Sequence, residues 1–218
     1  MQIDTTGSAD LDSLALDNGS GDLCGTVTFS VEPNSLGCAD VGDNIVTLYV
    51  TNSVYNTSEC TATVNVQDTT PPIARCMNVT LNLDLSGNLT VVPGDVDDGS
   101  VDGCSLSLSV SPNTFDCDDV GDNTVTLTAT DPSFLTDDCT ASVAIQDNGP
   151  PTAACKDATI QIDGTGTANL ATSDVDNGST DDCGIASMSV SPDQFGCSEQ
   201  GVNAVVLTVV AVSYTHLT

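Results

Sequence analysis

The chain of 218 residues carries 2 Lys and Arg against 31 Asp and Glu, a formal net charge of −29 at pH 7. We therefore expect no nucleic acid as a partner, because there are too few cations to neutralise phosphates. No uninterrupted run of 18 apolar residues is present, so we expect no direct membrane insertion of this segment.

The remaining composition favours a folded, secreted protein. Hydrophobic residues make up 39% of the chain, which separates it from disordered acidic tails. Aromatic residues make up only 3%, and ten cysteines can stabilise the small cores that result. Cysteines in this number indicate an oxidising compartment, so we expect an extracellular or cell-surface location. The pattern at Met1 is already strand-like, and we expect the chain to be a piece of a longer protein.

An internal repeat of 79 to 80 residues organises the chain. The cysteines recur at this offset, as Cys24, Cys104 and Cys183 illustrate. Stiff Pro-Pro pairs at 71–72 and 150–151 mark the boundaries. The predicted repeats are 1–68, lacking its beginning, 69–147, complete, and 148–218, lacking its end.

Within the complete repeat, apolar residues alternate with polar ones at the period of two that half-buried strands prefer. The turn residues Ser86 to Asn88 separate the first two segments. No stretch has a helical period. We therefore expect an all-β fold of tandem immunoglobulin-like β-sandwich repeats. The expected strands lie, in chain order, within 79–83, 89–92, 106–110, 125–129 and 139–146.

Three runs in this repeat resemble hyalin-type repeats: Asp68 to Cys76 (DTTPPIARC), Asp95 to Cys104 (DVDDGSVDGC) and Phe115 to Asn123 (FDCDDVGDN). They are most similar to the tandem versions in large cell-surface adhesins and fibrous proteins of Bacteroidota and other aquatic bacteria. The resemblance implies an extracellular structural role. It ends at about Ala211, after which the chain departs from the repeat and contains its single His216.

The cysteines are expected to form disulfides within each repeat. In a sandwich, the first and last strands both begin at the same end, which pairs Cys76 with Cys139. The alternative partner Cys155 would be tens of ångströms from Cys139 at ~3.3 Å per strand residue, far beyond the ~7 Å Cα limit. A second expected pair joins Cys104 to Cys117, which leaves Cys60 and Cys155 unpaired. Its repeat counterparts are Cys24–Cys38 and Cys183–Cys197. A zinc site is disfavoured, because there is no Cys-x-x-Cys pair and no usable His.

Clustered aspartates predict calcium sites. Only three of the 31 acidic residues are Glu, and the short Asp side chains gather in loops. Neighbouring carboxylates repel, and Ca²⁺ relieves that cost by taking six to eight oxygen ligands. The candidate ligands are Asp17, Asp40, Asp43, Asp68, Asp95, Asp97, Asp98, Asp102, Asp119, Asp122, Asp131, Asp147, Asp174, Asp176 and Asp181.

Two placements of the cation stay open. One lies across the join between repeats, where Asp68 or Asp147 ends a last strand beside the first loop of the next repeat. The other lies within a repeat, where Asp131, Asp137 and Asp138 would share a site with Asp95 and Asp97.

No catalytic constellation is present, since no genuine His or buried Lys can serve as a base, and we expect no enzyme. Glycosylation is a separate hypothesis. Some candidates lie in Asp-Thr or Asp-Ser patterns that resemble Bacteroidota O-glycosylation, and others in Asn-x-Ser/Thr sequons. These candidates are Thr5, Ser13, Thr69, Asn56, Asn78 and Asn88.

The leading functional hypothesis is a structural repeat segment of a secreted or cell-surface filament or adhesin, rigidified by calcium and disulfides. Its expected partners are copies of itself, joined end to end. The alternative is an adhesive module that binds a glycan or a protein. Binding faces usually carry aromatic anchors, whereas Tyr49, Tyr55, Phe115 and Phe134 are few and scattered.

Overall fold

The computed structural model describes residues 1–212, and these form an all-β protein, as expected. The first repeat contains β1 (Ser8–Asp10), α1 (Ser13–Leu16), β2 (Val27–Glu32), β3 (Ser35–Gly37), η1 (Cys38–Asp40), β4 (Gly42–Asn52) and β5 (Thr57–Val66). The second contains β6 (Val79–Asn82), β7 (Asn88–Thr90), α2 (Pro93–Val96), β8 (Ser107–Ser111), β9 (Thr114–Asp116), η2 (Cys117–Asp119), β10 (Gly121–Thr130) and β11 (Thr136–Gln146). The third contains β12 (Thr167–Asn169), α3 (Thr172–Val175), β13 (Ile185–Ser191), β14 (Gln194–Gly196), η3 (Cys197–Glu199) and β15 (Val206–Ala211).

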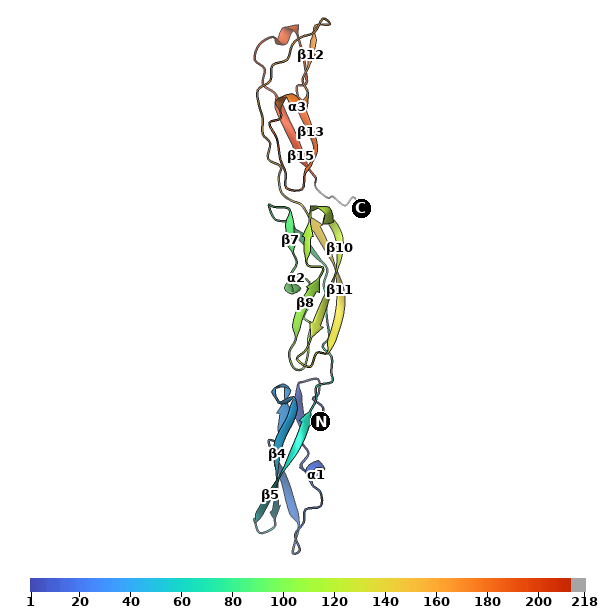
Figure 1. Ribbon diagram of the computed structural model, residues 1–218, viewed down its shortest axis with the longest axis vertical. Helices are drawn as coiled ribbons and strands as arrows, with labels where there is room; N and C mark the ends of the chain where they lie inside the picture. Colours follow the sequence, from blue (N-terminus) through green and yellow to red (C-terminus); the bar gives the residue numbers. More distant parts are fainter. Residues whose placement is uncertain (213–218) are drawn as a thin grey trace. The chain divides into compact units, whose positions relative to one another are not determined.

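The strand pairing repeats along the chain. Small antiparallel sheets form from β1 with β3, β7 with β9, and β12 with β14. The larger sheets are β2-β4-β5, β6-β11-β10-β8 and β13-β15. In the second of these β6 runs parallel to β11, as the sandwich topology requires for the first and last strands of a repeat. Figure 1 shows the long antiparallel pairing of β4 with β5.

Alternate residues of the strands form the core. On β10, Val125, Leu127 and Ala129 are fully buried, and they are separated by threonines. On β11, Val143 and Ile145 are fully buried in the same alternation. This period of two is the one that predicted the strands.

Short helical turns are the main addition to the expected elements. α1, α2 and α3 have four residues each, and η1, η2 and η3 have three. A single turn is too short to show a 3.6-residue period, so the sequence pattern could not reveal it. None of these helices in residues 1–212 has the length or the apolar character to cross a membrane.

The chain groups into two compact units, and both cut across the predicted repeats. Unit 1 contains Met1–Met77, Pro93–Ser111 and Thr126–Ala141. Unit 2 contains Asn78–Val92, Pro112–Val125 and the described part of Ser142–Thr218. The repeat boundaries at 68 and 147 stay a prediction. Each unit holds one complete Pro-Pro segment, and we call residues 68–76 the first join and residues 147–155 the second join.

Each join is held by the loop that precedes the next large sheet. In the first join, the N–H of Ile73 donates to the carbonyl of Val101 at 2.8 Å and that of Arg75 donates to Ser100 Oγ at 3.0 Å. In the second, the N–H of Thr152 donates to the carbonyl of Thr180 at 2.7 Å. The segment after each Pro-Pro pair is therefore fixed against its own repeat.

Candidate metal centre

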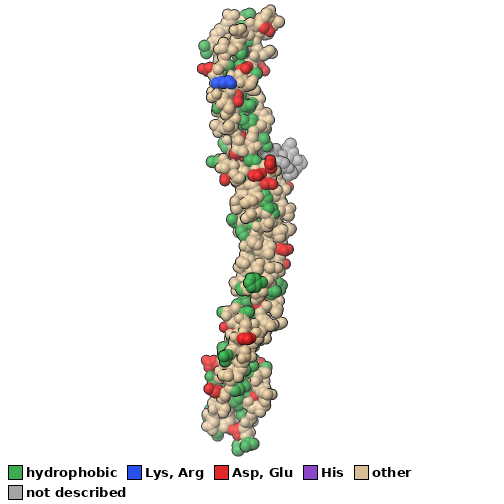
Figure 2. Space-filling model, in the orientation of Figure 1, with side chains coloured by type: hydrophobic (Ala, Val, Ile, Leu, Met, Phe, Trp, Pro, Cys, Tyr) green, Lys and Arg blue, Asp and Glu red, His purple; other side chains and the backbone are tan. Residues whose placement is uncertain are grey.

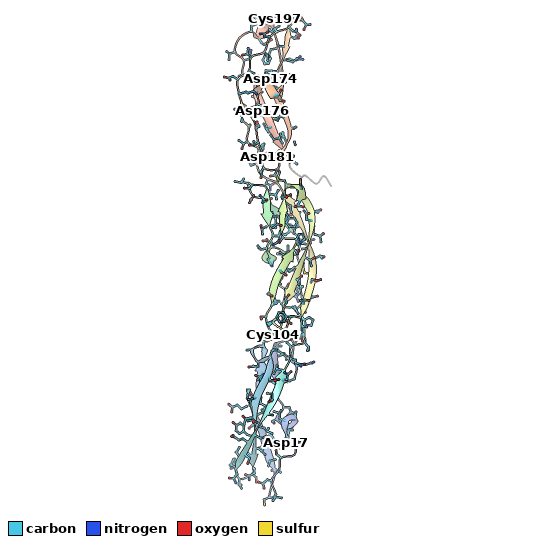
Figure 3. The ribbon with its side chains drawn as sticks, in the orientation of Figure 1. Asp17, Cys104, Asp174, Asp176, Asp181 and Cys197 are labelled. Carbon is cyan, nitrogen blue, oxygen red and sulfur yellow. A yellow bond between two sulfur atoms is a disulfide. The ribbon has the colours of Figure 1, made fainter. Side chains whose placement is uncertain are left out.

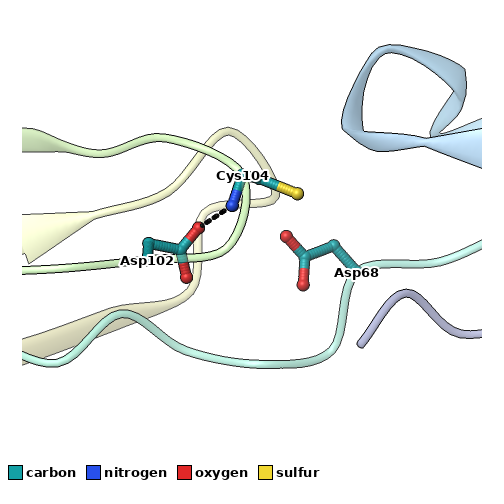
Figure 4. Close-up of side chains that lie close together, drawn as sticks. All are labelled: Asp68, Asp102 and Cys104. Atoms are coloured by element: carbon teal, nitrogen blue, oxygen red, sulfur yellow. Dashed lines mark hydrogen bonds between the residues drawn. The ribbon is translucent and has the colours of Figure 1, made fainter. Parts of the chain in front are cut away.

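Two carboxylates meet at the first join. Asp68 follows β5, and Asp102 lies in the loop before β8. Their carboxylate oxygens and the sulfur of Cys104 lie within 4.8 Å of one another. The N–H of Cys104 donates to Asp102 Oδ2 at 2.7 Å, and the N–H of Thr70 donates to Asp68 Oδ1 at 3.1 Å. Figure 4 shows that the two carboxylates point toward each other.

The second join repeats this arrangement. Asp147 and Asp182 hold carboxylate oxygens within 4.8 Å of each other and of the sulfur of Cys183. Asp147 is only 4% exposed, and its Oδ1 accepts from the N–H of Gly149 at 2.9 Å. A Cβ on Gly149 would lie 2.9 Å from Asp182 Oδ1 and 3.2 Å from Asp147 Oδ1, so only glycine leaves the space beside both carboxylates open.

The donor set of both clusters consists of carboxylates. The neighbouring sulfurs belong to disulfides, and a disulfide sulfur is no thiolate ligand. Carboxylate oxygens suit hard cations such as Ca²⁺. Within residues 1–212, Asp147 Oδ2 and Asp181 Oδ2 are buried without a hydrogen-bond partner. A buried charged oxygen without a partner is costly, and a divalent cation supplies the missing interaction. The residues of the second join therefore fit calcium.

The two clusters differ in charge. Asp102 and Asp181 occupy the same repeat position, and so do Gly103 and Asp182. The second join thus has Asp182 beside Asp147, with Asp181 next to Asp182 in the sequence, whereas the first has Asp102 beside Asp68. Because calcium affinity rises with the number of charged ligands, the second join is the stronger candidate.

Three disulfides occur in residues 1–212, and one matches the expectation. Cys76 is bonded to Cys139, with their Cα atoms 5.9 Å apart. The other expected pairs, Cys104–Cys117, Cys24–Cys38 and Cys183–Cys197, are wrong. The two remaining bonds each cross a join, and both have a Cα separation of 5.2 Å: Cys38–Cys104 and Cys117–Cys183.

The length of the strands explains this correction. Cys183 lies two residues before Ile185, where β13 begins, and the seven residues of β13 carry the chain away before it reaches Cys197. Seven strand residues span about 23 Å, so Cys183 and Cys197 cannot bond. The expected Cys24–Cys38 pair fails in the same way across β2. The expected pairs require both cysteines to lie at the same end of a repeat. Within the described chain, Cys24, Cys60, Cys155 and Cys197 are exposed and unpaired.

Several predicted metal ligands accept hydrogen bonds within turns. Asp97 Oδ1 accepts from the N–H and the hydroxyl of Ser100, at 2.9 and 2.6 Å. Asp176 makes the same two bonds to Ser179, at 3.0 and 2.6 Å. The serine hydroxyl is the main cause that lowers the pKa of Asp97 and of Asp176. Asp17 accepts from the N–H of Ser20 at 2.9 Å, and its pKa is also lowered.

The other predicted ligands are spread over the molecule. In Figure 3, Asp174 and Asp176 lie together in the third repeat, apart from Asp181. Asp40, Asp119 and Asp174 each accept a backbone N–H from three residues earlier. Asp43 accepts from the side chain of Asn65. Asp95 and Asp122 take part in other interactions, and Asp98 is exposed.

The within-repeat placement of calcium has one buried carboxylate in its favour. Asp137 accepts the N–H of Ala74 at 2.9 Å. Asp131 is 4% exposed, and its Oδ1 accepts from the N–H of Leu135 at 2.8 Å. Its Oδ2 is buried without a hydrogen-bond partner, as Asp147 Oδ2 and Asp181 Oδ2 are. Among the described residues, the close groupings of potential ligands include Asp68 with Asp102 and Asp147 with Asp182, but not Asp131 with Asp97.

The glycosylation candidates lie mostly on the surface. Thr5, Thr69, Asn56, Asn78 and Asn88 are exposed, and Ser13 is half-buried. Asn78 Oδ1 accepts from the N–H of Ser142 at 2.9 Å. Their modification stays a prediction.

Two exposed aromatic residues occupy equivalent positions in two repeats, although the aromatic residues look scattered in the sequence. Tyr55 and Phe134 share one repeat position, at the tips of the β4–β5 and β10–β11 hairpins. Their side chains are 91% and 86% exposed, and their φ angles are 67° and 64°. Comparing the repeats at these two positions would have revealed the pair.

No protein-family model and no curated protein matches the sequence. Among solved structures, the chain is similar to a protocadherin gammaB7 EC3-6 cis-dimer, with 16% identity and a TM-score of 0.31 over 61% of this chain and 45% of that one. It is similar to the human desmocollin-1 ectodomain, with 11% identity and a TM-score of 0.30 over 97% of this chain and 52% of that one. The titin domains I67–I69 match with 12% identity and a TM-score of 0.22 over 94% of this chain and 76% of that one. The chain spans about half the length of the protocadherin gammaB7 chains it matches. The fold assignment rests on the strand pairing described above.

Proposed function

We propose that the chain is a structural repeat segment of an extracellular filament or adhesin, whose joins between repeats are held by disulfides and by calcium. The observation that carries this proposal is the coincidence, at both joins, of a crossing disulfide and a carboxylate pair. Cys104 lies two residues after Asp102, and Cys183 directly follows Asp182. A join that is both cross-linked and cation-bound suits a protein that transmits tension or keeps a fixed spacing.

Asp147, Asp181 and Asp182 would hold calcium at the second join, and Asp68 and Asp102 would hold it at the first. The bound ion would supply positive charge between carboxylates that otherwise repel. Mg²⁺ suits these sites less well, because it keeps its waters and demands an octahedral geometry. The disulfides support an extracellular setting. Extracellular modules bind calcium with dissociation constants of about 0.1 to 1 mM, so even weak sites at the joins would serve there.

The hyalin-type resemblance supports the same role at the level of the family. Repeats of this kind occur in tandem in large surface proteins, and the sequence runs that carry the resemblance include both Asp68 and Asp102. We infer that the end-to-end partner of one repeat is another repeat. Catalysis has no part in this proposal.

Calcium titration tests the proposal directly. Isothermal calorimetry on EGTA-treated protein should detect calcium binding, and calcium should raise the melting temperature, because an ion that binds only the native state stabilises it by mass action. Asp147→Asn should weaken the binding. Asp157→Asn is the matched control, because Asp157 is exposed and the substitution removes the same charge. No heat of binding and an unchanged melting temperature at millimolar calcium would refute the calcium role.

A second candidate function, adhesion through the hairpin tips, is favoured by Tyr55 and Phe134. Exposed aromatic side chains stack on sugars and anchor protein contacts. On the face that Figure 2 shows, hydrophobic side chains form small, separate patches among polar atoms, so the tips would act singly. Saturable binding on a glycan array that is lost in the variant Tyr55→Ala/Phe134→Ala would support this function, and no binding by the parent chain would refute it.

A further inference from the structure

Two residues at the ends of the long hairpin strands occupy one repeat position but differ in charge. Asn52 ends β4, and Asp131 directly follows β10. Their turns are built alike. The N–H of Tyr55 donates to the carbonyl of Asn52 at 3.0 Å, and that of Phe134 donates to the carbonyl of Asp131 at 3.1 Å. The two side chains can therefore be compared atom by atom.

One side-chain oxygen has the same role in both turns. Asn52 Oδ1 accepts from the N–H of Asn56 at 3.0 Å, and Asp131 Oδ1 accepts from the N–H of Leu135 at 2.8 Å. Because Oδ1 is held by the turn, the second terminal atom leaves the turn at the same place. This atom is the amide nitrogen Nδ2 in Asn52 and the carboxylate oxygen Oδ2 in Asp131.

The strand beside each hairpin is also in the same register. The hydroxyl of Thr28 on β2 donates to the carbonyl of Thr51 at 3.2 Å, and that of Ser107 on β8 donates to the carbonyl of Thr130 at 3.2 Å. The Asp-x-Cys turns that precede β2 and β8 therefore meet the two hairpins in the same way. All of these residues belong to unit 1.

In the first repeat the second terminal atom has a partner in the Asp-x-Cys turn. Asn52 Nδ2 donates to Asp22 Oδ2 at 2.7 Å, while Asp22 Oδ1 accepts from the N–H of Cys24 at 2.8 Å. Asp102 is the counterpart of Asp22, and its Oδ2 accepts from the N–H of Cys104 at 2.7 Å. The other oxygen of Asp102, Oδ1, is thus the counterpart of the oxygen that binds Asn52.

In the second repeat this donor is missing. Asp131 carries an oxygen where Asn52 carries an amide nitrogen, so Asp102 receives no hydrogen bond from it. Asp131 is 4% exposed, and its Oδ2 is buried without a hydrogen-bond partner. A buried charged oxygen without a partner is costly, and a facing carboxylate adds repulsion. A cation between Asp131 and Asp102 would remove both costs.

We propose that Asp131 is a third carboxylate ligand of calcium at the first join and binds the ion through Oδ2, beside Asp68 and Asp102. The proposal rests on the calcium role proposed above. Asp131 is outside the set of ligand atoms that all lie within 4.8 Å of one another. Two oxygens on opposite sides of one Ca²⁺ are about 5 Å apart, since each lies about 2.3 to 2.6 Å from the ion. This spacing leaves room for Asp131 in the same coordination sphere.

The second join has no equivalent ligand, because Ala211 stands at this position in the third repeat. Asp131 would thus bring the first join closer to the second in charge. The second join stays the stronger site, since its close cluster contains the buried Asp147. The consequence of removing Asp131 should therefore appear at the weaker binding step.

The first test is calcium titration of the full chain after EGTA treatment. Asp131→Asn should weaken the step at the first join by about tenfold or more, because a charged ligand is lost, and should leave the step at the second join unchanged. Asp138→Asn is the matched control, because it removes the same charge from an exposed position of the same hairpin. It should leave both steps unchanged.

Thermal unfolding gives a second readout. In EGTA, Asp131→Asn should raise the melting temperature, because the new amide can donate to Asp102 as Asn52 donates to Asp22. In calcium this advantage should shrink or reverse, because the parent then gains the ion that the variant binds weakly. Circular dichroism verifies that the variant folds.

The reverse exchange tests the same rule in the first repeat. Asn52→Asp replaces the donor to Asp22 with a carboxylate, so it should lower the melting temperature in EGTA, and calcium should restore part of the loss. Asn56→Asp is the control, because it adds the same charge at an exposed position of the same hairpin. It should show no such dependence on calcium.

Three outcomes would overturn the proposal. The first is an Asp131→Asn variant whose calcium steps equal those of the parent. The second is a gain of stability in EGTA that persists in full with calcium, which would show that the two carboxylates repel but bind no ion. The third is an Asp138→Asn variant that weakens calcium binding as much as Asp131→Asn, which would show an effect of net charge alone.

The outcomes separate this ligand from the proposed calcium role. A chain whose calcium binding responds to Asp147→Asn but not to Asp131→Asn refutes the Asp131 ligand alone. A chain that responds to Asp131→Asn but not to Asp147→Asn refutes the calcium site of the second join alone. A parent chain that binds no calcium refutes both.

Discussion

Asp147 and Asp182 hold carboxylate oxygens within 4.8 Å of each other, although Asp147 is almost fully buried. Two such charges repel by about 1 kcal/mol in water and about 4 kcal/mol at the effective dielectric near a protein surface. The native chain without a cation therefore carries a strain at the second join that a divalent ion would remove.

The first prediction concerns this repulsion. In EGTA, Asp147→Asn should raise the free energy of unfolding by about 1 to 4 kcal/mol, because it removes one of two repelling charges. When calcium is added, the free energy of unfolding should rise less for this variant than for the parent. Urea denaturation with and without calcium measures both effects. A variant less stable than the parent in EGTA would show that the Asp147 charge is already compensated within the protein.

The second prediction concerns the three-carboxylate composition of the second join. Asp182→Asn gives the loop of the second join the charge of the loop at the first join, where Gly103 occupies the same position. We expect weaker calcium binding at the second join, with the first join unaffected. Calorimetry that resolves two binding steps should show the stronger step, at the second join, weaken toward the affinity of the first join, while the weaker step stays unchanged. Equal affinities in parent and variant would contradict a role for Asp182 as a ligand.

Features that form within one repeat could be predicted from the sequence, whereas features that join two repeats could not. The strands followed from alternation, and the parallel pairing of β6 with β11 followed from the sandwich. The Cys76–Cys139 pair depended on this topology and was expected. The partners of Cys38 and Cys117 could not be predicted in this way. Each partner lies in the next repeat, so the pairing depends on how consecutive repeats contact each other.

The acidic clusters were likewise predicted only in part from the sequence. The loop composition indicates many aspartates as candidate ligands, but Asp97 and Asp176 accept hydrogen bonds from serines three residues later in the same turn. A short Asp serves both as a turn residue and as a cation ligand. Only the arrangement of the aspartates in space distinguishes a turn residue from a candidate cation ligand. Asp182 is not in the expected ligand set, although it lies in the same acidic loop as Asp174, Asp176 and Asp181.

The third prediction concerns the disulfides. Cys38–Cys104 closes a loop with a sequence separation of 66, and Cys76–Cys139 one of 63. Loops of this size correspond to a stabilisation of about 4 kcal/mol each in the chain-entropy model. Replacing either pair with serines should therefore lower the free energy of unfolding by similar amounts in urea denaturation. The pair Cys60→Ser/Cys155→Ser, which breaks no bond, is the control and should change little.

The fourth prediction concerns acid stability. The folded pKa of Asp97 is lowered mainly by the Ser100 hydroxyl. Ionised Asp97 therefore adds stability above the unfolded pKa of about 3.9, and this contribution is lost as the pH falls through the lower folded pKa. Ser100→Ala should raise the folded pKa and move the acid unfolding midpoint to higher pH. Ser109→Ala, at an exposed strand position, is the control. Equal midpoints for the two variants would contradict the assignment.

The last prediction concerns the hairpin tip at Phe134. Its φ of 64° lies in the left-handed region, which costs a residue with a Cβ about 1 to 2 kcal/mol. The greater freedom of glycine in the unfolded chain offsets about 0.5 to 1 kcal/mol of the relief. Because the side chain is 86% exposed, its removal loses little burial. Phe134→Gly should therefore be more stable than the parent by up to about 1 kcal/mol. Phe134→Ala keeps the Cβ and should gain nothing, so equal stability of the two variants in urea would mean that the tip is not strained.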